Sequence, residues 1–285
     1  MQQKYKIFFT VILIFFFTVS NNIFCQLNVT LKQEQRGYDA IKASKILSVT
    51  QVQYKYSNGE PDVDGRNLLY NKFDSTGKCI HWIRYWPDGS KLEEINQYTY
   101  NEKGYITCIT SIGMDGHIDT RTENIYDAKG NEIETNKYDT GGALMTTWIH
   151  KYDDKGREIE QTITKGSDHL PLRKVYIYDD SKNIVETDYF RQDTLTYKYV
   201  TQYSKNNMPI KEDQFTPGEE HTRRALYSYD TAGCLVENRN SYGDGKLISI
   251  TKYRYNESGN IIEEEHYNSN EEPESLVKYT YEYYK

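Results

Sequence analysis

The sequence contains few of the residues that form an ordinary hydrophobic core. Leu, Ile, Val and Phe together make up less than a fifth of residues 26–285, a level at which disorder becomes the default expectation. The 28 tyrosines of the chain offset this shortage, because amphipathic rings suit a thin sheet that is wet on one side. We therefore expect a β-sheet protein without a thick core.

The chain also lacks the short motifs of common catalytic and cofactor sites. Its six histidines form no close pair of the kind that a zinc site needs. No glycine-rich phosphate loop and no nucleophile elbow are present. The net charge of −7 argues against nucleic acid as a partner. We expect no catalytic residues, no metal and no cofactor, so an enzyme is the less favoured class.

The only long apolar run lies at the N-terminus, where residues 7–19 follow two lysines. This run is shorter than the roughly 20 residues that span a bilayer, and its pattern is typical of a secretory signal. We predict a signal peptide at residues 1–25, no membrane span, and a secreted, periplasmic or outer-surface location. A lipid on Cys25 is the alternative to simple cleavage, but Phe24 stands where a lipoprotein signal has a small residue.

A repeat of about 26 residues runs through the rest of the chain. Each copy starts at an aromatic residue, namely Phe73, Tyr100, Tyr126, Tyr152, Tyr178, Tyr203, Tyr229 and Tyr255, with Tyr281 near the end. Four residues later stands a glycine in six copies, replaced by Lys182 and Asn207 in two. Glycine accepts the positive φ that closes a tight hairpin. We assign residues 26–69 to an N-terminal cap or leading strands and residues 70–285 to tandem repeats.

Each copy has a second turn about twelve residues later, so that one repeat holds two strands. The fold class is all-β, an antiparallel β-hairpin repeat array of sixteen to eighteen strands, in a meander or a curled sheet. With a four-residue loop, the aromatic pairs with the position five later, and Tyr176 then faces the β-branched Val185. The segment 36–47 is the one candidate helix, and we expect it to cap the array.

The acidic residues that follow the aromatics are explained better by turns than by catalysis. Asp127 and Asp139 stand at positions where acids recur from copy to copy and asparagine replaces them in two, as turn-capping residues do. Acid–base catalysis instead needs two carboxyl groups in different environments. Cys79 and Cys108 lie on equivalent strands, about 9.6 Å apart, which is too far for a disulfide. We expect both, and Cys234, to be unpaired and packed in the sheet.

Two segments resemble a known repeat family. Residues 126–134, YDAKGNEIE, and 152–160, YDDKGREIE, are similar to the YD repeats of the RHS family, with the motif Tyr-Asp-x-x-Gly-Arg/Asn. The likeness covers about residues 70–285. It implies a secreted or surface-exposed strip of β-sheet, sometimes associated with carbohydrate binding. The repeat here is longer than the usual YD repeat, and we expect no effector domain after it, so the toxin role of some RHS proteins is not carried over.

Aromatic side chains on a rigid sheet can stack on sugar rings, and the candidate binding surface consists of Trp82, Tyr85, Trp86, Tyr98, Tyr100 and Trp148. The alternative is that most rings pack the sheet, because an exposed aromatic row is an aggregation hazard. We predict a binding or structural module of the cell envelope that engages a glycan or a protein partner. A partner or immunity-like protein for an RHS-type toxin is the alternative. A glycan-active enzyme is less favoured, and a non-repeating acid pair on a concave surface would support it.

Overall fold

The computed structural model describes residues 39–285, except residues 89, 167–169 and 219, so the predicted signal peptide lies outside the described residues. Within them, a short helix at residues 39–43 precedes the strands. The strands are β1 (Ile46–Ser57), β2 (Glu60–Pro61), β3 (Arg66–Phe73), β4 (Cys79–Tyr85), β5 (Lys91–Tyr100), β6 (Ile106–Gly113), β7 (Ile118–Tyr126), β8 (Glu132–Tyr138), β9 (Leu144–Tyr152), β10 (Glu158–Lys165), β11 (Leu172–Tyr178), β12 (Ile184–Arg191), β13 (Thr194–Tyr203), β14 (Pro209–Phe215), β15 (His221–Tyr229), β16 (Leu235–Tyr242), β17 (Leu247–Tyr255), β18 (Ile261–Tyr267) and β19 (Pro273–Tyr283).

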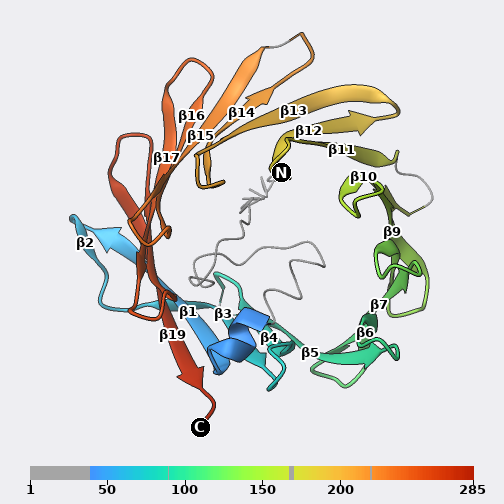
Figure 1. The fold of residues 1–285 in the computed structure, drawn as a ribbon. Coiled ribbons are helices and arrows are strands. Elements are labelled where there is room, and N and C mark those ends of the chain that lie inside the picture. Colours follow the sequence, from blue (N-terminus) through green and yellow to red (C-terminus); the bar gives the residue numbers. More distant parts are fainter. Residues whose placement is uncertain (1–38, 89, 167–169, 219) are drawn as a thin grey trace, which may run out of the picture.

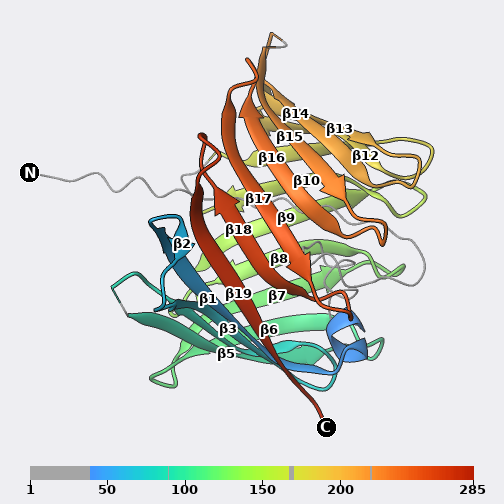
Figure 2. The same ribbon diagram turned by 90° about the vertical axis from the view of Figure 1, so that its left-hand side faces the viewer.

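These strands form one closed antiparallel barrel. From β3 to β19 each strand pairs with the next along the chain, and β1 pairs with both β19 and β3. The ring therefore holds 18 strands, and the two-residue β2 pairs only with β1. Figure 1 shows the ring end-on, and in Figure 2 the strands run obliquely to its axis, as closure of a sheet requires. The all-β antiparallel prediction is confirmed, but the open meander or curled sheet is wrong, because β1 joins the two ends.

The helical part of the N-terminal segment ends earlier than expected. Among the described residues the helix covers residues 39–43, and the chain enters β1 at Ile46 instead of continuing as a helix to residue 47. Pairing on both sides of β1 favours the strand over local helix propensity. Ile41 and Ile46 pack with Phe73 in a small buried cluster at one end of the barrel.

The first turn of every repeat has the same hydrogen bonds. In the copy that starts at Tyr126, the N–H of Gly130 donates to the carbonyl of Asp127, at 3.0 Å, and the N–H of Asp127 donates to the carbonyl of Asn131. The Asp127 carboxylate accepts the Asn131 N–H at 2.8 Å, and this bond holds the pKa of Asp127 below its usual value. Asp139 caps the next turn by accepting from Gly141 and Ala143. Both aspartates are therefore turn caps, as predicted.

Positive φ recurs where the glycine does. Gly130 has φ 83°, and the two substitutes Lys182 and Asn207 hold 70° and 57° at the same position. A side chain in this region of φ is strained. The two substitutes therefore show that the turn, rather than the residue type, determines the backbone conformation at this position.

The pairing register differs from the expectation. Tyr178 pairs with Ile184, six residues later, and Ile177 pairs with Glu186. Val185 is therefore the extra residue of a β-bulge, and Tyr176 pairs with Thr187 rather than with Val185. The same shift recurs at the other first turns, from Phe73 to Tyr255.

The repeat tyrosines tie each hairpin to the one before it. The hydroxyl of Tyr126 donates to the carbonyl of Ile106 at 2.8 Å. Equivalent bonds, each to a carbonyl 19 or 20 residues earlier, are made by Tyr152, Tyr178, Tyr203, Tyr229, Tyr255 and Tyr281. These carbonyls lie beside the bulge, so the tyrosines satisfy acceptors that the ladder leaves open. This explains why the aromatic is nearly always tyrosine.

The two faces of the sheet differ in burial. Asn124, Thr187 and Glu212 are 6%, 6% and 7% exposed, whereas Ile125 and Ile177 on the alternate face are 45% and 44% exposed. Closing a sheet crowds the side chains of its concave face, so we assign the buried face to the inner wall. The repeat tyrosines share this wall.

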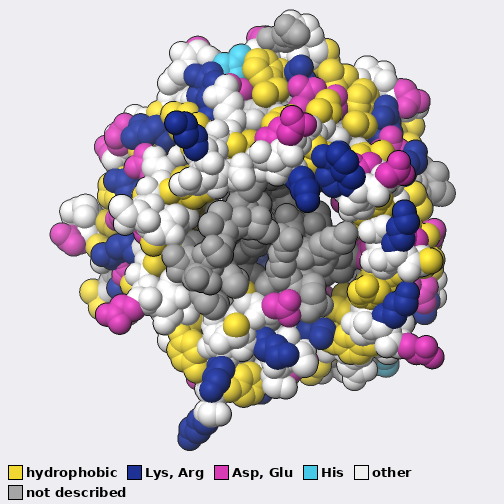
Figure 3. Space-filling model, in the orientation of Figure 1, with side chains coloured by type: hydrophobic (Ala, Val, Ile, Leu, Met, Phe, Trp, Pro, Cys, Tyr) yellow, Lys and Arg dark blue, Asp and Glu magenta, His cyan; other side chains and the backbone are white. Residues whose placement is uncertain are grey.

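The outer wall mixes aliphatic and charged side chains. Ion pairs join neighbouring strands at Lys151–Glu160, 2.7 Å, and at Lys198–Glu186, 3.5 Å. In Figure 3, which looks down the barrel, basic and acidic side chains are interspersed around the rim. Among the described residues, none of the helical structure is long and apolar enough to cross a membrane.

Candidate functional site

The six aromatic residues predicted to bind do not form one patch. Tyr85 and Trp86 lie at the end of β4, and Tyr85 pairs with Lys91 at the start of β5. Tyr98 and Tyr100 lie at the far end of β5, so that seven residues separate Lys91 from Tyr98, about 23 Å along a strand. Two groups at opposite ends of the barrel cannot hold one small ligand.

Some of these aromatic residues contact the scaffold, whereas others are exposed. The hydroxyl of Tyr98 donates to the carbonyl of Cys79, so that ring is part of the scaffold. Trp86 is 40% exposed under the Arg84 guanidinium, and Tyr100 is 43% exposed. Trp82 pairs with Asn71 and Glu94 near the seam of the barrel. Glycan binding at these residues stays a prediction.

Trp148 lies elsewhere, on β9, between Thr135 of β8 and Ile163 of β10. It shares the inner wall with His150, because side chains two residues apart on a strand point the same way. Of the six predicted residues, it is the one that stands beside a break in the repeat.

That break concerns three inner-wall positions in adjacent repeats. Six residues after the starting aromatic, six copies carry Cys79, Ile106, Ile184, Pro209, Leu235 and Ile261. The two adjacent copies carry Glu132 and Glu158 instead. On the strand between them, His150 takes the place that tyrosine holds in most copies, two residues before the aromatic. Two acids and a histidine therefore replace the scaffold residues at one place on the wall.

The three side chains are in contact. His150 Nδ1 lies 2.8 Å from Glu158 Oε1, and His150 Nε2 lies 3.7 Å from Glu132 Oε1. The hydroxyl of Thr135 donates to the Glu132 carboxylate. The side chains of Glu132, His150 and Glu158 are 4%, 11% and 14% exposed. We call Glu132, His150 and Glu158, with Trp148 beside them, the inner-wall site.

Adjacent strands hold the backbone of this site in place. The hydroxyl of Tyr152 donates to the Glu132 carbonyl at 2.7 Å, and that of Tyr178 to the Glu158 carbonyl at 2.6 Å. Burial, with Glu158 close by, raises the pKa of Tyr178 to about 12. The tyrosines are therefore neutral donors at physiological pH, and the site's carboxylates keep fixed positions.

This arrangement suits two kinds of chemistry. Carboxylates accept hydrogen bonds from hydroxyl groups, and a neighbouring indole offers a flat apolar surface. An imidazole between two carboxylates can also carry a proton toward either of them. No group of three or more His, Cys, Asp or Glu side chains in the described part of the chain could hold a metal ion.

Reasoning from the sequence missed Glu132, His150 and Glu158, although a signal was present. The two glutamates stand at a position that is apolar in the other copies, and His150 stands where most copies have tyrosine. Aligning the copies by their starting aromatics shows both departures. The cysteine prediction is confirmed for Cys79 and Cys108, which are free on β4 and β6, but it is wrong for Cys234, which is disulfide-bonded. Burial raises the pKa of the Cys79 thiol to about 11.

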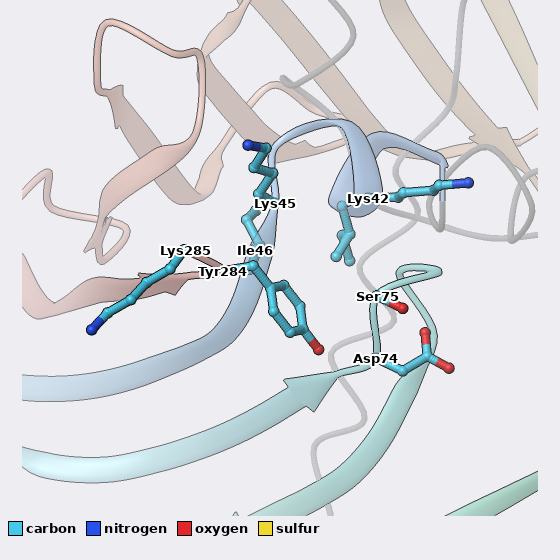
Figure 4. Close-up of a pocket in the computed structure, with 8 residues that line it drawn as sticks. Lys42, Lys45, Ile46, Asp74, Ser75, Tyr284 and Lys285 are labelled. Atoms are coloured by element: carbon cyan, nitrogen blue, oxygen red, sulfur yellow. The ribbon is translucent and has the colours of Figure 1, made fainter.

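A hollow lies elsewhere, between the short helix and the chain end (Figure 4). It measures about 300 Å³ and includes Lys42, Lys45 and Lys285 in its lining. The three ammonium groups point in different directions, and the Tyr284 hydroxyl donates to the carbonyl of Phe73 at 2.6 Å. We interpret this hollow as a joint of the cap.

Comparisons with known proteins describe the chain as follows. A family model described as "Uncharacterised protein" matches residues 39–190. A search of curated proteins finds no match. The family description names no RHS or YD repeat, so that likeness stays a prediction.

Solved structures of several kinds are similar to the chain. A porin-like protein from Bacteroides uniformis has a TM-score of 0.45 at 10% identity, with 83% of this chain and 98% of that chain covered. A porin-like protein from Bacteroides vulgatus has a TM-score of 0.30 at 12% identity and the same coverage. The TcdB2-TccC3-Cdc42 structure has a TM-score of 0.29 at 11% identity, covering 78% of this chain and 18% of that one. None of these likenesses assigns a function.

Proposed function

The chain belongs to the family of uncharacterised proteins whose model matches residues 39–190, and we propose that it is a secreted or cell-envelope binding module. Its ligand is a polyhydroxylated molecule, of which glycans are the main class. The ligand contacts the inner-wall site.

One observation carries this proposal: on the inner wall, two adjacent copies of the repeat have glutamates where the other copies have apolar residues or cysteine. A scaffold gains nothing from two buried carboxylates beside a histidine, because burying charges costs free energy unless they are paired. Glu132 and Glu158 nevertheless take positions that are apolar in the other copies, at 4% and 14% side-chain exposure. Trp148 adds an aromatic ring on the same wall. Carboxylates beside an aromatic ring match the hydroxyls and the apolar faces of a sugar.

The N-terminal segment and the outer wall both support the proposed location. The N-terminal lysines and apolar run are typical of an export signal. The outer wall, with ion pairs such as Lys151–Glu160, suits contact with water, since a wall that faces lipid carries an apolar band.

The test is a glycan array probed with the full chain without residues 1–25, followed by calorimetric titration of the best glycan. We expect Trp148→Ala to weaken binding at least tenfold, which corresponds to about 1.4 kcal/mol, and Glu158→Gln to weaken it further than Glu160→Gln. Trp86→Ala is the matched control for an aromatic residue outside the site, and it should bind as the unchanged chain does. Failure to bind any glycan, or equal binding by the two tryptophan variants, would contradict the proposal.

A glycan-active enzyme is the second candidate, favoured by the same acid pair. Glycoside hydrolysis uses two carboxyl groups that differ in protonation, placed on either side of the bond to be broken. His150 lies within 4 Å of both carboxyl groups. Chromatography of each bound glycan after overnight incubation would show hydrolysis, and Glu132→Gln and Glu158→Gln should each abolish it. Intact glycans would favour the binding module alone.

A further inference from the structure

Tyr105 departs from the repeat at the first turn of the copy that starts at Tyr100. It stands five residues after the starting aromatic, where the other copies carry Lys78, Asn131, Arg157, Asn183, Met208, Cys234 and Asn260. In three of these copies the side chain donates to the acid that caps its own turn, as Asn131 does to Asp127 at 2.9 Å. Tyr105 is the one aromatic residue at this position, and it is 37% exposed. The turn itself therefore does not require a tyrosine here.

The Tyr105 ring reaches the turn of the next copy. It stacks on the ring of Tyr126, with 5.1 Å between the ring centres and 23° between the planes. Its hydroxyl lies over Gly130, where any side chain would collide with it. The Lys103 ammonium group donates to the carbonyl of Ala128 at 3.2 Å. Two side chains therefore link the first turns of adjacent copies.

A cleft of about 270 Å³ lies between these two turns. Its lining consists of two aromatic rings and four polar side chains, namely Tyr105, Tyr126, Asn101, Glu102, Lys103 and Asp127. The volume is just below the range of about 300–1,000 Å³ that is usual for ligand pockets, so the cleft suits one sugar unit rather than a larger molecule. Aromatic rings beside carboxylate acceptors and an ammonium donor match the apolar faces and the hydroxyl groups of a sugar.

The cleft adjoins the inner-wall site. Tyr126, which lines the cleft, pairs with Glu132 across β7 and β8, and residues directly opposite each other in antiparallel strands have Cα atoms about 4.5–5.5 Å apart. Glu132 Oε1 in turn lies 3.7 Å from His150 Nε2 on β9. Aromatic rings, a carboxylate and an imidazole therefore follow one another across β7, β8 and β9 at the first-turn end of the barrel.

We propose that this cleft is a second subsite for the ligand of the inner-wall site, and that the ligand is an oligosaccharide rather than a monosaccharide. One sugar unit stacks on Tyr105 in the cleft, while a neighbouring unit contacts Glu132 and His150. The inference rests on the proposed function, because it extends the same glycan site. The ring of Tyr105 contributes to affinity only when the glycan is long enough to reach it.

The experiment is calorimetric titration of the full chain without residues 1–25. The probes are the oligosaccharide that binds most tightly on the glycan array and the monosaccharides of which it consists. We expect the oligosaccharide to bind at least tenfold more tightly than any of its monosaccharides, which corresponds to about 1.4 kcal/mol. A monosaccharide that binds as tightly as the oligosaccharide would overturn the proposal.

Variants of Tyr105 test the contribution of its ring. Tyr105→Asn introduces the residue that three other copies carry at this position, so the turn should still form and the circular dichroism spectrum should stay the same. It should weaken binding of the oligosaccharide about tenfold, whereas Tyr105→Phe, which keeps the ring, should bind as the unchanged chain does. Unchanged binding by Tyr105→Asn, or an equal loss in both variants, would contradict stacking on this ring.

An acidic residue of the cleft gives a second test that does not depend on the tyrosine. Glu102→Gln should weaken binding of the oligosaccharide more than Glu257→Gln, because Glu257 is the exposed acid at the same position of another copy, outside the cleft. Equal affinities of these two variants would contradict a subsite in the cleft. Failure of every array glycan to bind would overturn the proposed function itself, whereas an oligosaccharide that binds all the cleft variants equally would overturn only this inference.

Discussion

Deleting one whole repeat and deleting half of one should have opposite outcomes, because the barrel is closed. Removal of residues 229–254 takes out one 26-residue unit, with β16 and most of β17, and joins Ser228 to Tyr255. Tyr255 then occupies the place of Tyr229, where its hydroxyl can donate to the Pro209 carbonyl. The ring keeps an even number of strands, 16 instead of 18, so β1 still meets β19 in the antiparallel sense. We expect this variant to fold, with a melting temperature below that of the full chain.

Removal of residues 229–241 takes out β16 alone and leaves an odd number of strands. Every later strand then runs opposite to its former direction, so β19 would meet β1 in parallel. The seam joins nine antiparallel residue pairs, from Ile46↔Tyr283 to Lys55↔Ser275. At about 1 kcal/mol per net hydrogen bond, its loss costs on the order of 9 kcal/mol. A typical domain is stable by about 5–15 kcal/mol in total, so this variant should not fold.

The assays are the soluble fraction after expression, far-ultraviolet circular dichroism and thermal unfolding. A soluble half-repeat variant that melts with the whole-repeat variant would refute the reasoning. It would mean that neither the seam nor the even strand number controls folding.

Three further predictions concern single side chains. Tyr229→Phe removes the donor to the Pro209 carbonyl at 2.8 Å and should lower the free energy of unfolding by about 1–3 kcal/mol in urea titration. Tyr242→Phe, at an exposed ring, should change the free energy of unfolding little. Equal effects would show that the hydroxyl bonds of the repeat tyrosines do not stabilise the barrel. Lys182→Gly relieves the backbone strain of a side chain held at φ 70°, so it should stabilise the fold by about 1 kcal/mol and raise the melting temperature. A lower melting temperature would show that the lysine side chain stabilises the fold by more than its strain costs. Burial raises the pKa of Glu212 to about 7, so the folded state keeps a proton that the unfolded state loses near pH 4.5. The free energy of unfolding should therefore fall between pH 4.5 and 7, by on the order of 3 kcal/mol. Glu212→Gln should remove this pH dependence when unfolding is measured across the same range.

The local part of the structure could be predicted from the sequence. The recurrence of an aromatic, an acid and a glycine predicted the hairpins and the turn caps. The structure adds that Lys182 and Asn207 take the positive φ of the glycine that they replace. These features depend on contacts within about ten residues, where spacing and turn chemistry decide the conformation. The predicted pairing of Tyr176 with Val185 was wrong, although it too concerns residues close in the chain, since nothing in the spacing marks Val185 as the extra residue of a bulge.

The candidate site was predicted less well. Trp148 was among the six aromatic residues, but the other five lie elsewhere on the barrel, and Glu132, His150 and Glu158 were not among the predicted binding residues. Glu132 and Glu158 are 26 residues apart in the chain, and His150 meets both only because β8, β9 and β10 lie side by side. The site therefore depends on strand pairing as well as on residue type.

The amino-acid pattern predicts the repeat, its length, its two turns and the antiparallel order of neighbouring strands, because each of these follows from contacts between residues close in the chain. That the array closes is seen only in the folded barrel. Closure depends on β1 pairing with β19, which joins residues more than 200 positions apart, such as Tyr54 and Leu276, and no periodic pattern specifies a partner at that distance. Closure in turn makes one face of the sheet concave, and so it decides that the tyrosines and the acid pair line an inner wall.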